Sequence, residues 1–205
     1  KPASLKQFFS EIDCIEKLEF NLNGSNLNSL YGTFYNSENI KEIDFGVIDT
    51  TKVENFGYTF CNCHSLTSVN LTYITTSHVN DMSKMFSGCN ELLSLDLSKF
   101  DTSSVTKMDS MFNGCTKVQN INLGNNFHTS NVVNMEKMFN GCKSLSSLDL
   151  YAHTNKSPLP LFTFITKLLG NKLQSISSIL SYLPYNLTRI AESPVSSIYF
   201  RTAYL

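Results

Sequence analysis

A unit of about 26 residues recurs along most of the chain, and this repeat constrains the fold more than any other feature. Each unit opens on a phenylalanine, and successive ones lie 25, 26, 26, 26 and 27 residues apart: Phe9, Phe34, Phe60, Phe86, Phe112 and Phe139. Self-similarity at a period of about 20 to 50 residues is typical of stacked repeat architectures. Because one unit buries too little apolar surface to offset the entropy of ordering it, several units must stack.

Each unit carries the motif L-x-x-L-x-L, which is typical of the strand in a leucine-rich repeat. In the fourth unit the motif consists of Leu92, Leu95 and Leu97. Side chains alternate between the two faces of a strand, so Leu95 and Leu97 should point inward and Asp96 outward. We expect these strands to stack into a parallel sheet on one side of the domain.

The second half of the unit predicts a short helix. In one copy its apolar residues are spaced as one helix face: Val105, Met108, Met111, Phe112 and Cys115. A glycine follows the Met-Phe pair in three units, where a helix would end in a left-handed residue: Gly88, Gly114 and Gly141. Asn62 takes that place in the third unit. We therefore predict helical turns on the side opposite the strands.

The full pattern L-x-x-L-D-L-S-x-F-D-T-S-x-V-T-x-M-x-x-M-F-x-G-C resembles the repeat of BspA-like leucine-rich repeat surface proteins. Residues 82–150 match it closely, 34–81 moderately and 9–33 loosely. The resemblance implies a curved parallel solenoid on a bacterial or protist surface, used for adhesion and protein binding. The expected fold class is an α/β solenoid, a right-handed leucine-rich-repeat-like coil with a parallel β-sheet on one side, short helical turns on the other, and a C-terminal helical segment.

The repeat also predicts the domain boundaries. Residues 1–150 form the solenoid, with units starting near residues 9, 34, 60, 86, 112 and 139; residues 151–160 form a polar linker. Within 161–205, apolar residues spaced by three and four predict an amphipathic helix. This segment could cap the last coil, lie on a membrane or be a poorly ordered tail. Membrane contact is the weaker hypothesis, because its polar face is mainly Ser, Thr and Asn.

Composition narrows the classes of partner. Charged residues make up 16% of the chain, and the net charge is −1. This balance offers no electrostatic attraction for nucleic acid, and we expect none as a partner. The chain contains no stretch of about 20 uncharged apolar residues, so we predict no membrane-spanning helix. The chain starts at Lys1-Pro2, so we take it as a fragment or a processed form.

Four cysteines recur at one position of the repeat: Cys63, Cys89, Cys115 and Cys142. We expect them to be small buried side chains in a ladder, a geometry that suits neither a disulfide nor converging metal ligands. We therefore predict no metal site and no cofactor. The histidines occupy different repeat positions, so the neighbours Cys63 and His64 are the one pair on which an enzyme hypothesis could rest.

The outward strand position forms the candidate site. It is a row of acids and amides: Asp44, Asn70, Asp96, Asn122 and Asp149. In one interpretation these are solvated strand residues that alternate acid and amide to avoid stacking like charges. In the other they face a ligand, either carbohydrate or protein, with a weak cation site as a minor option.

These observations favour a non-catalytic recognition module. We expect an extracellular or cell-surface adhesion protein that binds a protein or glycan on another cell or matrix through its polar strand face. The alternative is a structural spacer or an intracellular protein-interaction scaffold without a dedicated small-molecule ligand. We expect no enzymatic activity.

Overall fold

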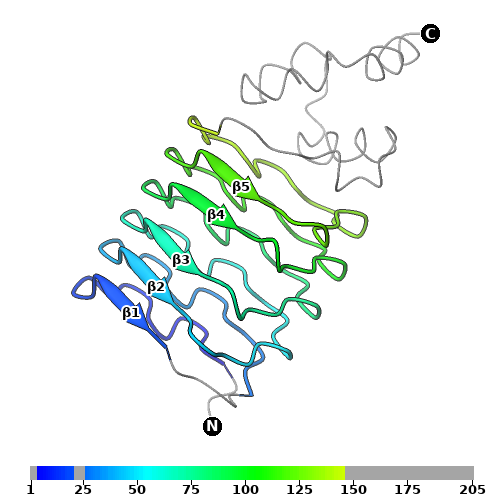
Figure 1. The fold of residues 1–205 in the computed structure, drawn as a ribbon, viewed down its shortest axis with the longest axis horizontal. Coiled ribbons are helices and arrows are strands. Elements are labelled where there is room, and N and C mark those ends of the chain that lie inside the picture. Colours follow the sequence, from blue (N-terminus) through cyan, green and yellow to red (C-terminus); the bar gives the residue numbers. More distant parts are fainter. Residues whose placement is uncertain (1–3, 21–25, 146–205) are drawn as a thin grey trace.

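Successive coils, each with one short strand, make up the computed structural model, which describes residues 4–20 and 26–145. The strands are three residues long: β1 (Lys17–Glu19), β2 (Glu42–Asp44), β3 (Ser68–Asn70), β4 (Ser94–Asp96) and β5 (Asn120–Asn122). They lie side by side in chain order (Figure 1). All pairings are parallel, β1-β2-β3 in one sheet and β4-β5 in a second. This arrangement fits a solenoid-like fold.

The register of the strands follows the sequence repeat. Ile43 pairs with Leu18 on one side and Val69 on the other, and Leu95 pairs with Ile121. Each partner is one repeat away, so equivalent residues of neighbouring units lie beside one another. Residues at the same position of successive repeats are therefore neighbours in the structure, as the repeat predicts.

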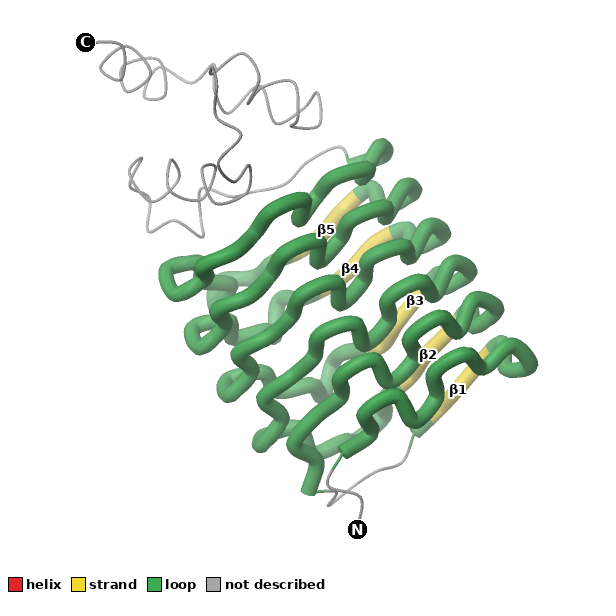
Figure 2. Tube along the Cα trace, turned by 180° about the vertical axis from the view of Figure 1, so that it is seen from behind, coloured by secondary structure: helices red, strands yellow, loops and turns green. Residues whose placement is uncertain are grey.

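A second row of contacts joins the coils on the side away from the strands (Figure 2). Single parallel bridges connect equivalent residues of six successive units: Ser4, Ser29, Asn55, Asp81, Lys107 and Asn134. The coils are thus hydrogen-bonded on both sides, which holds each one parallel to its neighbours.

The predicted strand phase is confirmed. Leu95 is 4% exposed and Leu97 is fully buried, whereas Asp96 between them is exposed. In β5, Ile121 is buried and both flanking residues are exposed. The period-two alternation of a strand therefore separates core from surface where the sequence predicts it.

The predicted helical turns are wrong, since the structure contains no helix within residues 4–20 and 26–145. Around Phe86 every second N–H donates to a carbonyl of the next coil, at 2.7–2.9 Å: Lys84 to Asp109, Phe86 to Met111 and Gly88 to Asn113. The N–H groups between them donate three residues back, from Met85, Ser87 and Cys89. An α-helix needs each of these donors for the carbonyl four residues back. Here half of these donors bond to the next coil, and the other half close tight turns within their own coil.

Two left-handed residues in each unit make this turn possible. The predicted position is confirmed, because φ is 77° at Gly88 and 62° at Asn62. The other position was not predicted. It has φ of 58° at Tyr58, 53° at Lys84 and 59° at Lys137, side chains that seldom adopt this conformation.

The apolar residues assigned to the helix face are buried despite the different backbone. Met82, Met85, Phe86 and Cys89 are all fully buried. The phenylalanines that open the units form a continuous stack of rings, with centroids 5.6, 5.7, 5.1, 5.9 and 5.3 Å apart from Phe9 to Phe139. The core is therefore a set of ladders that run along the stack.

The threonine of the T-S-x-V segment forms another buried ladder. The Thr76 hydroxyl donates to the Asp101 carbonyl at 2.8 Å and accepts the Asp101 N–H at 2.8 Å. Thr102 makes the same pair of bonds with His128, at 2.7 and 2.6 Å. Each buried hydroxyl thus forms hydrogen bonds with both the N–H and the carbonyl of one residue in the next coil.

The predicted linker at 151–160 and the predicted C-terminal helical segment at 161–205 lie outside the described residues. The same is true of Asp149, the last member of the proposed strand row.

Candidate ligand-binding face

The proposed site residues that the structure describes lie in one row on the outer face of the strands. Asn70, Asp96 and Asn122 are exposed, and Asp44 is half-buried. They occupy the last position of β2, β3, β4 and β5, and the strand register brings Asp44 beside Asn70 and Asp96 beside Asn122. We call these four residues the strand row.

Acid and amide in the strand row are hydrogen-bonded in pairs. Asn70 Nδ2 donates to Asp44 Oδ1 at 3.0 Å, and Asn122 Nδ2 donates to Asp96 Oδ1 at 3.0 Å. The alternation of acid and amide along the chain therefore does more than avoid like-charge contacts. It gives each carboxylate a donor from the neighbouring coil.

The loop after each strand holds the same side chains from the other direction. Each side-chain oxygen accepts the N–H two residues further on: Gly46 to Asp44, Thr72 to Asn70, Ser98 to Asp96 and Gly124 to Asn122. In the described structure both bonds of Asp44 and both bonds of Asp96 use Oδ1. Oδ2 of the exposed Asp96 therefore keeps its acceptor capacity for a ligand.

The strand row divides between β3 and β4. The same place separates the two sheets. The row thus consists of two similar acid–amide pairs, one on coils two and three and one on coils four and five. Each pair offers carboxylate acceptors in a fixed orientation.

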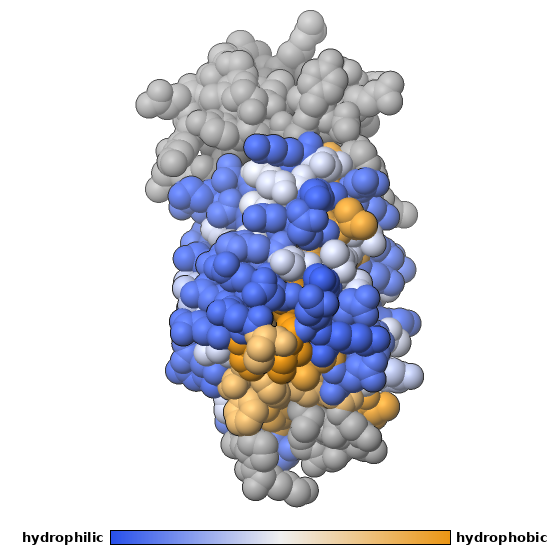
Figure 3. Space-filling view, turned by 90° about the vertical axis from the view of Figure 1, so that its left-hand side faces the viewer, coloured by the Kyte–Doolittle hydropathy of each residue, from blue (hydrophilic) through white to orange (hydrophobic). Residues whose placement is uncertain are grey.

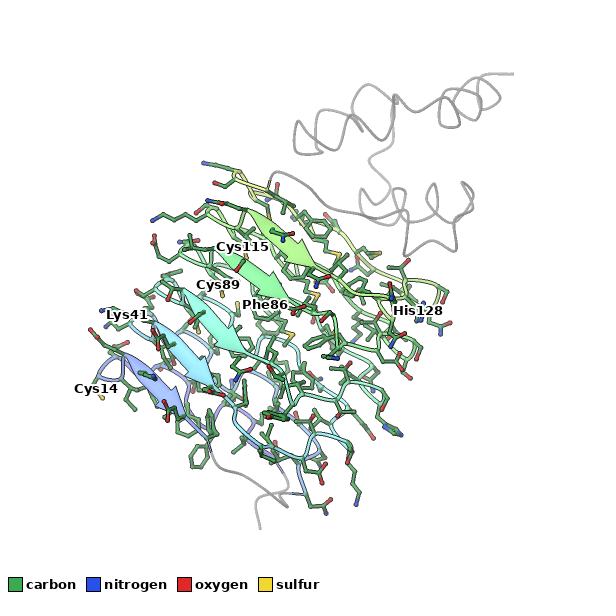
Figure 4. All side chains as sticks on the ribbon, viewed as in Figure 1. Cys14, Lys41, Phe86, Cys89, Cys115 and His128 are labelled. Carbon is green, nitrogen blue, oxygen red and sulfur yellow. The ribbon has the colours of Figure 1, made fainter. Side chains whose placement is uncertain are left out.

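The cysteine ladder is buried, as predicted. Cys63, Cys89 and Cys115 are fully buried, and each thiol donates to a phenylalanine carbonyl in the preceding coil, at 3.1, 3.2 and 3.1 Å. Figure 4 shows Cys89 and Cys115 at matching places on successive coils. Burial raises the pKa of Cys89 and Cys115 well above the ordinary thiol value, and that of Cys142 to about 12. These thiols are poor nucleophiles.

This burial predicts a single reactive thiol. Cys14 is exposed and the other five cysteines are buried. We expect a thiol reagent at about pH 8 to modify Cys14 rapidly in the native protein and the others only after unfolding, because a reagent reaches thiolates at the surface. The measurement is a time course of labelling followed by peptide mass spectrometry. Cys14→Ser should remove the fast phase, and rapid labelling of Cys89 would contradict the buried ladder.

The structure does not bring Cys63 and His64 together as a catalytic pair. The Cys63 thiol donates to the Phe34 carbonyl, and burial raises its pKa. His64 Nδ1 lies 3.7 Å from a carboxylate oxygen of Glu38. His128 lies at the end of the coils away from Cys89 and Cys115 (Figure 4).

Neither a cluster of metal ligands nor a membrane helix occurs in the described part of the chain. Within residues 4–20 and 26–145, no group of three or more His, Cys, Asp or Glu could hold a metal ion. Those residues also include no helix with the length and apolarity to span a bilayer.

A tyrosine cluster away from the strand row was not predicted. The rings of Tyr31 and Tyr58 are 5.3 Å apart, and those of Tyr35 and Tyr58 are 6.2 Å apart. Lys84 Nζ lies 4.9 Å from the Tyr58 ring centroid, and a hydrogen bond with Tyr58 raises the pKa of Lys84. These tyrosines occupy different positions of the repeat, so the repeat pattern carried no signal for the cluster.

Stacked coils that each contribute one parallel strand define a repeat protein of solenoid-like form. The chain belongs to the family described as Mycoplasma protein of unknown function, DUF285, whose profile matches residues 3–74 and 28–151. Among solved structures it is similar to a leucine-rich cell surface protein from Faecalibacterium prausnitzii A2-165, with 18% sequence identity and a TM-score of 0.33. That match covers 64% of this chain and 38% of the other. A search of curated proteins found no match.

Proposed function

We propose that this chain is a non-catalytic recognition module that binds a protein or glycan through the strand row. The observation that carries the proposal is the paired arrangement of Asp44 with Asn70 and of Asp96 with Asn122. The proposed setting is a cell surface, where the partner would belong to another cell or to a matrix. The repeat resemblance to BspA-like surface proteins supports this setting.

Rigidity of the strand row supports a binding role. Each side chain is held by a neighbouring coil and by the loop that follows its own strand. A ligand would therefore meet donors and acceptors that have already lost their rotamer freedom, which lowers the entropic cost of binding. The carboxylates suit the hydroxyl groups of a sugar or the N–H and cationic groups of a protein.

The spacer hypothesis explains the same contacts differently. Hydrogen bonds between adjacent coils also stabilise the stack, and a spacer would need them without any ligand. The two hypotheses predict different results when the surface of the row is changed while the coils stay folded. A recognition module would lose its ligand, whereas a spacer would have none to lose.

The test is a binding screen of the chain against cell-surface proteins and a glycan array. Asn70→Lys with Asp96→Lys raises the net charge of the strand row by three units, one at Asn70 and two at Asp96. We expect this double variant to lose at least about tenfold in affinity for any ligand of the row, because unfavourable charge at an interface discriminates strongly. Thermal melting of each variant checks that the fold is kept.

Glu54→Lys with Asn80→Lys is the matched control. It raises the net charge by the same three units, at two exposed residues beside the second row of bridges. A ligand that binds this control and not the strand-row variant supports the proposal. Equal binding to both variants would place the site elsewhere, with the tyrosine cluster as the next candidate. Absence of any ligand would favour the spacer.

A further inference from the structure

The first described coil exposes side chains whose equivalents in the second unit belong to the buried core. Ile15, Leu18 and Phe20 are half-buried, whereas their equivalents in the second unit are 1–2% exposed: Ile40, Ile43 and Phe45. Phe8 in the same coil is 66% exposed. Figure 3 shows apolar surface gathered at this end of the stack, while the surface further along is mostly hydrophilic.

Within residues 4–20 and 26–145, no strand pairs with the other edge of β1, on the same side of the molecule. β1 lies at the edge of its sheet and pairs with β2. The Glu16 carbonyl accepts the Glu42 N–H, and the Phe20 N–H donates to the Asp44 carbonyl. Alternate residues of a strand face opposite edges. The main-chain groups of Lys17 and Glu19 therefore point away from β2.

The side chains of β1 are complementary to themselves in one arrangement. The strand reads Lys17-Leu18-Glu19. In an antiparallel pair with a second copy, centred on Leu18, each Lys17 lies opposite Glu19 of the other copy. A parallel pair in register would instead place lysine against lysine and glutamate against glutamate. Charged residues on a free edge normally discourage pairing. Here the charges of Lys17 and Glu19 discourage parallel pairing and favour antiparallel pairing.

We propose that two copies of this chain associate end to end through antiparallel pairing of β1. The pairing is two-fold symmetric, as expected for a homodimer. Lys17 of each copy and Glu19 of the other exchange both main-chain hydrogen bonds, which gives four bonds across the interface. The two Leu18 side chains meet on the symmetry axis, and the half-buried Ile15, Phe20 and Phe9 flank them.

The present ion pairs of β1 allow this rearrangement. Lys17 Nζ lies 3.2 Å from Glu19 and 3.5 Å from Glu42. These side chains are 52–68% exposed, so their contacts are screened by solvent and contribute little. Lys17 can therefore turn toward the second copy without removing a buried charge from its partner.

Charge exchange tests the proposal on the full chain. Lys17→Glu leaves two acids beside Leu18, and Glu19→Lys leaves two lysines. Each change turns two attractive cross-strand pairs into two repulsive ones. We expect the wild type to form dimers in sedimentation velocity, and each single variant to associate at least about tenfold more weakly. The double variant K17E/E19K restores opposite charges and should dimerise like the wild type.

Mixing the two single variants gives the sharpest outcome. K17E and E19K should form a heterodimer at concentrations at which each variant alone is monomeric. Lys99→Glu, at an exposed residue of the fourth unit, is the control for the charge change and should dimerise normally. A wild type that stays monomeric throughout a concentration series overturns the proposal. Dimers that persist in both single variants place the interface elsewhere and also overturn it.

Discussion

Replacing Phe86 with alanine is expected to lower the free energy of unfolding by about 3–5 kcal/mol. The Phe86 ring is fully buried and stacks on Phe60 at 5.1 Å and on Phe112 at 5.9 Å. Removing it leaves a cavity in the middle of the aromatic ladder, and both neighbouring coils line this cavity. The rings above and below are held by their own backbones, so the cavity cannot close by a local shift. Urea unfolding followed by circular dichroism measures the loss.

Leu93→Ala is the matched control, because Leu93 is 50% exposed in the same unit. We expect it to change stability by less than about 0.5 kcal/mol. Equal losses in the two variants would mean that the phenylalanine ladder does not form the core.

Gly124→Ala is the second large effect that we expect, a loss of about 3–5 kcal/mol. Gly124 has φ of 69°, and a Cβ there would lie 2.4 Å from Ser98 Cα and 2.5 Å from the Ser98 carbonyl oxygen. Both contacts are with the backbone of the preceding coil, so relief requires the two coils to separate. Such a shift would also disturb the nearby bond between the Gly124 N–H and Asn122. Thermal or urea unfolding measures the effect.

Gly114→Ala separates the clash from the backbone strain. Gly114 also has positive φ, at 80°, but its added Cβ would meet its nearest neighbour at 3.6 Å, an ordinary contact. Asn62 already occupies the equivalent position in the third unit. We expect a loss of about 1–2 kcal/mol, from strain alone. If Gly114→Ala costs as much as Gly124→Ala, close approach of the coils is not the cause.

The burial of the Met-Phe segment could be predicted from sequence, but its backbone could not. Met82, Met85 and Phe86 are spaced in a way that suits a helix face, and they are indeed buried. Residues three and four apart can share a face in a helix or in a series of tight turns. The difference lies in where the N–H groups of Lys84 and Gly88 go, and the next coil supplies their acceptors.

The candidate site shows a similar division. The row of Asp44, Asn70, Asp96 and Asn122 could be predicted, because it needs only the repeat length and the strand alternation. The pairing of Asp96 with Asn122 and the division between β3 and β4 depend on how neighbouring coils are placed. The cluster of Tyr31, Tyr35 and Tyr58 is of this second kind too, since its members are out of phase with the repeat.

The sequence by itself determined the period of the stack, the inward and outward phase of the strands, the core ladders and the left-handed position at Gly88. Each of these properties depends on the order of residues within one unit, which is repeated often enough to be read directly. Only the tertiary structure decided the destinations of the backbone donors, the side-chain bonds of the strand row, the close approach of Gly124 to Ser98 and the open edge of β1. These properties depend on the distance and direction from one coil to the next, which no single unit encodes.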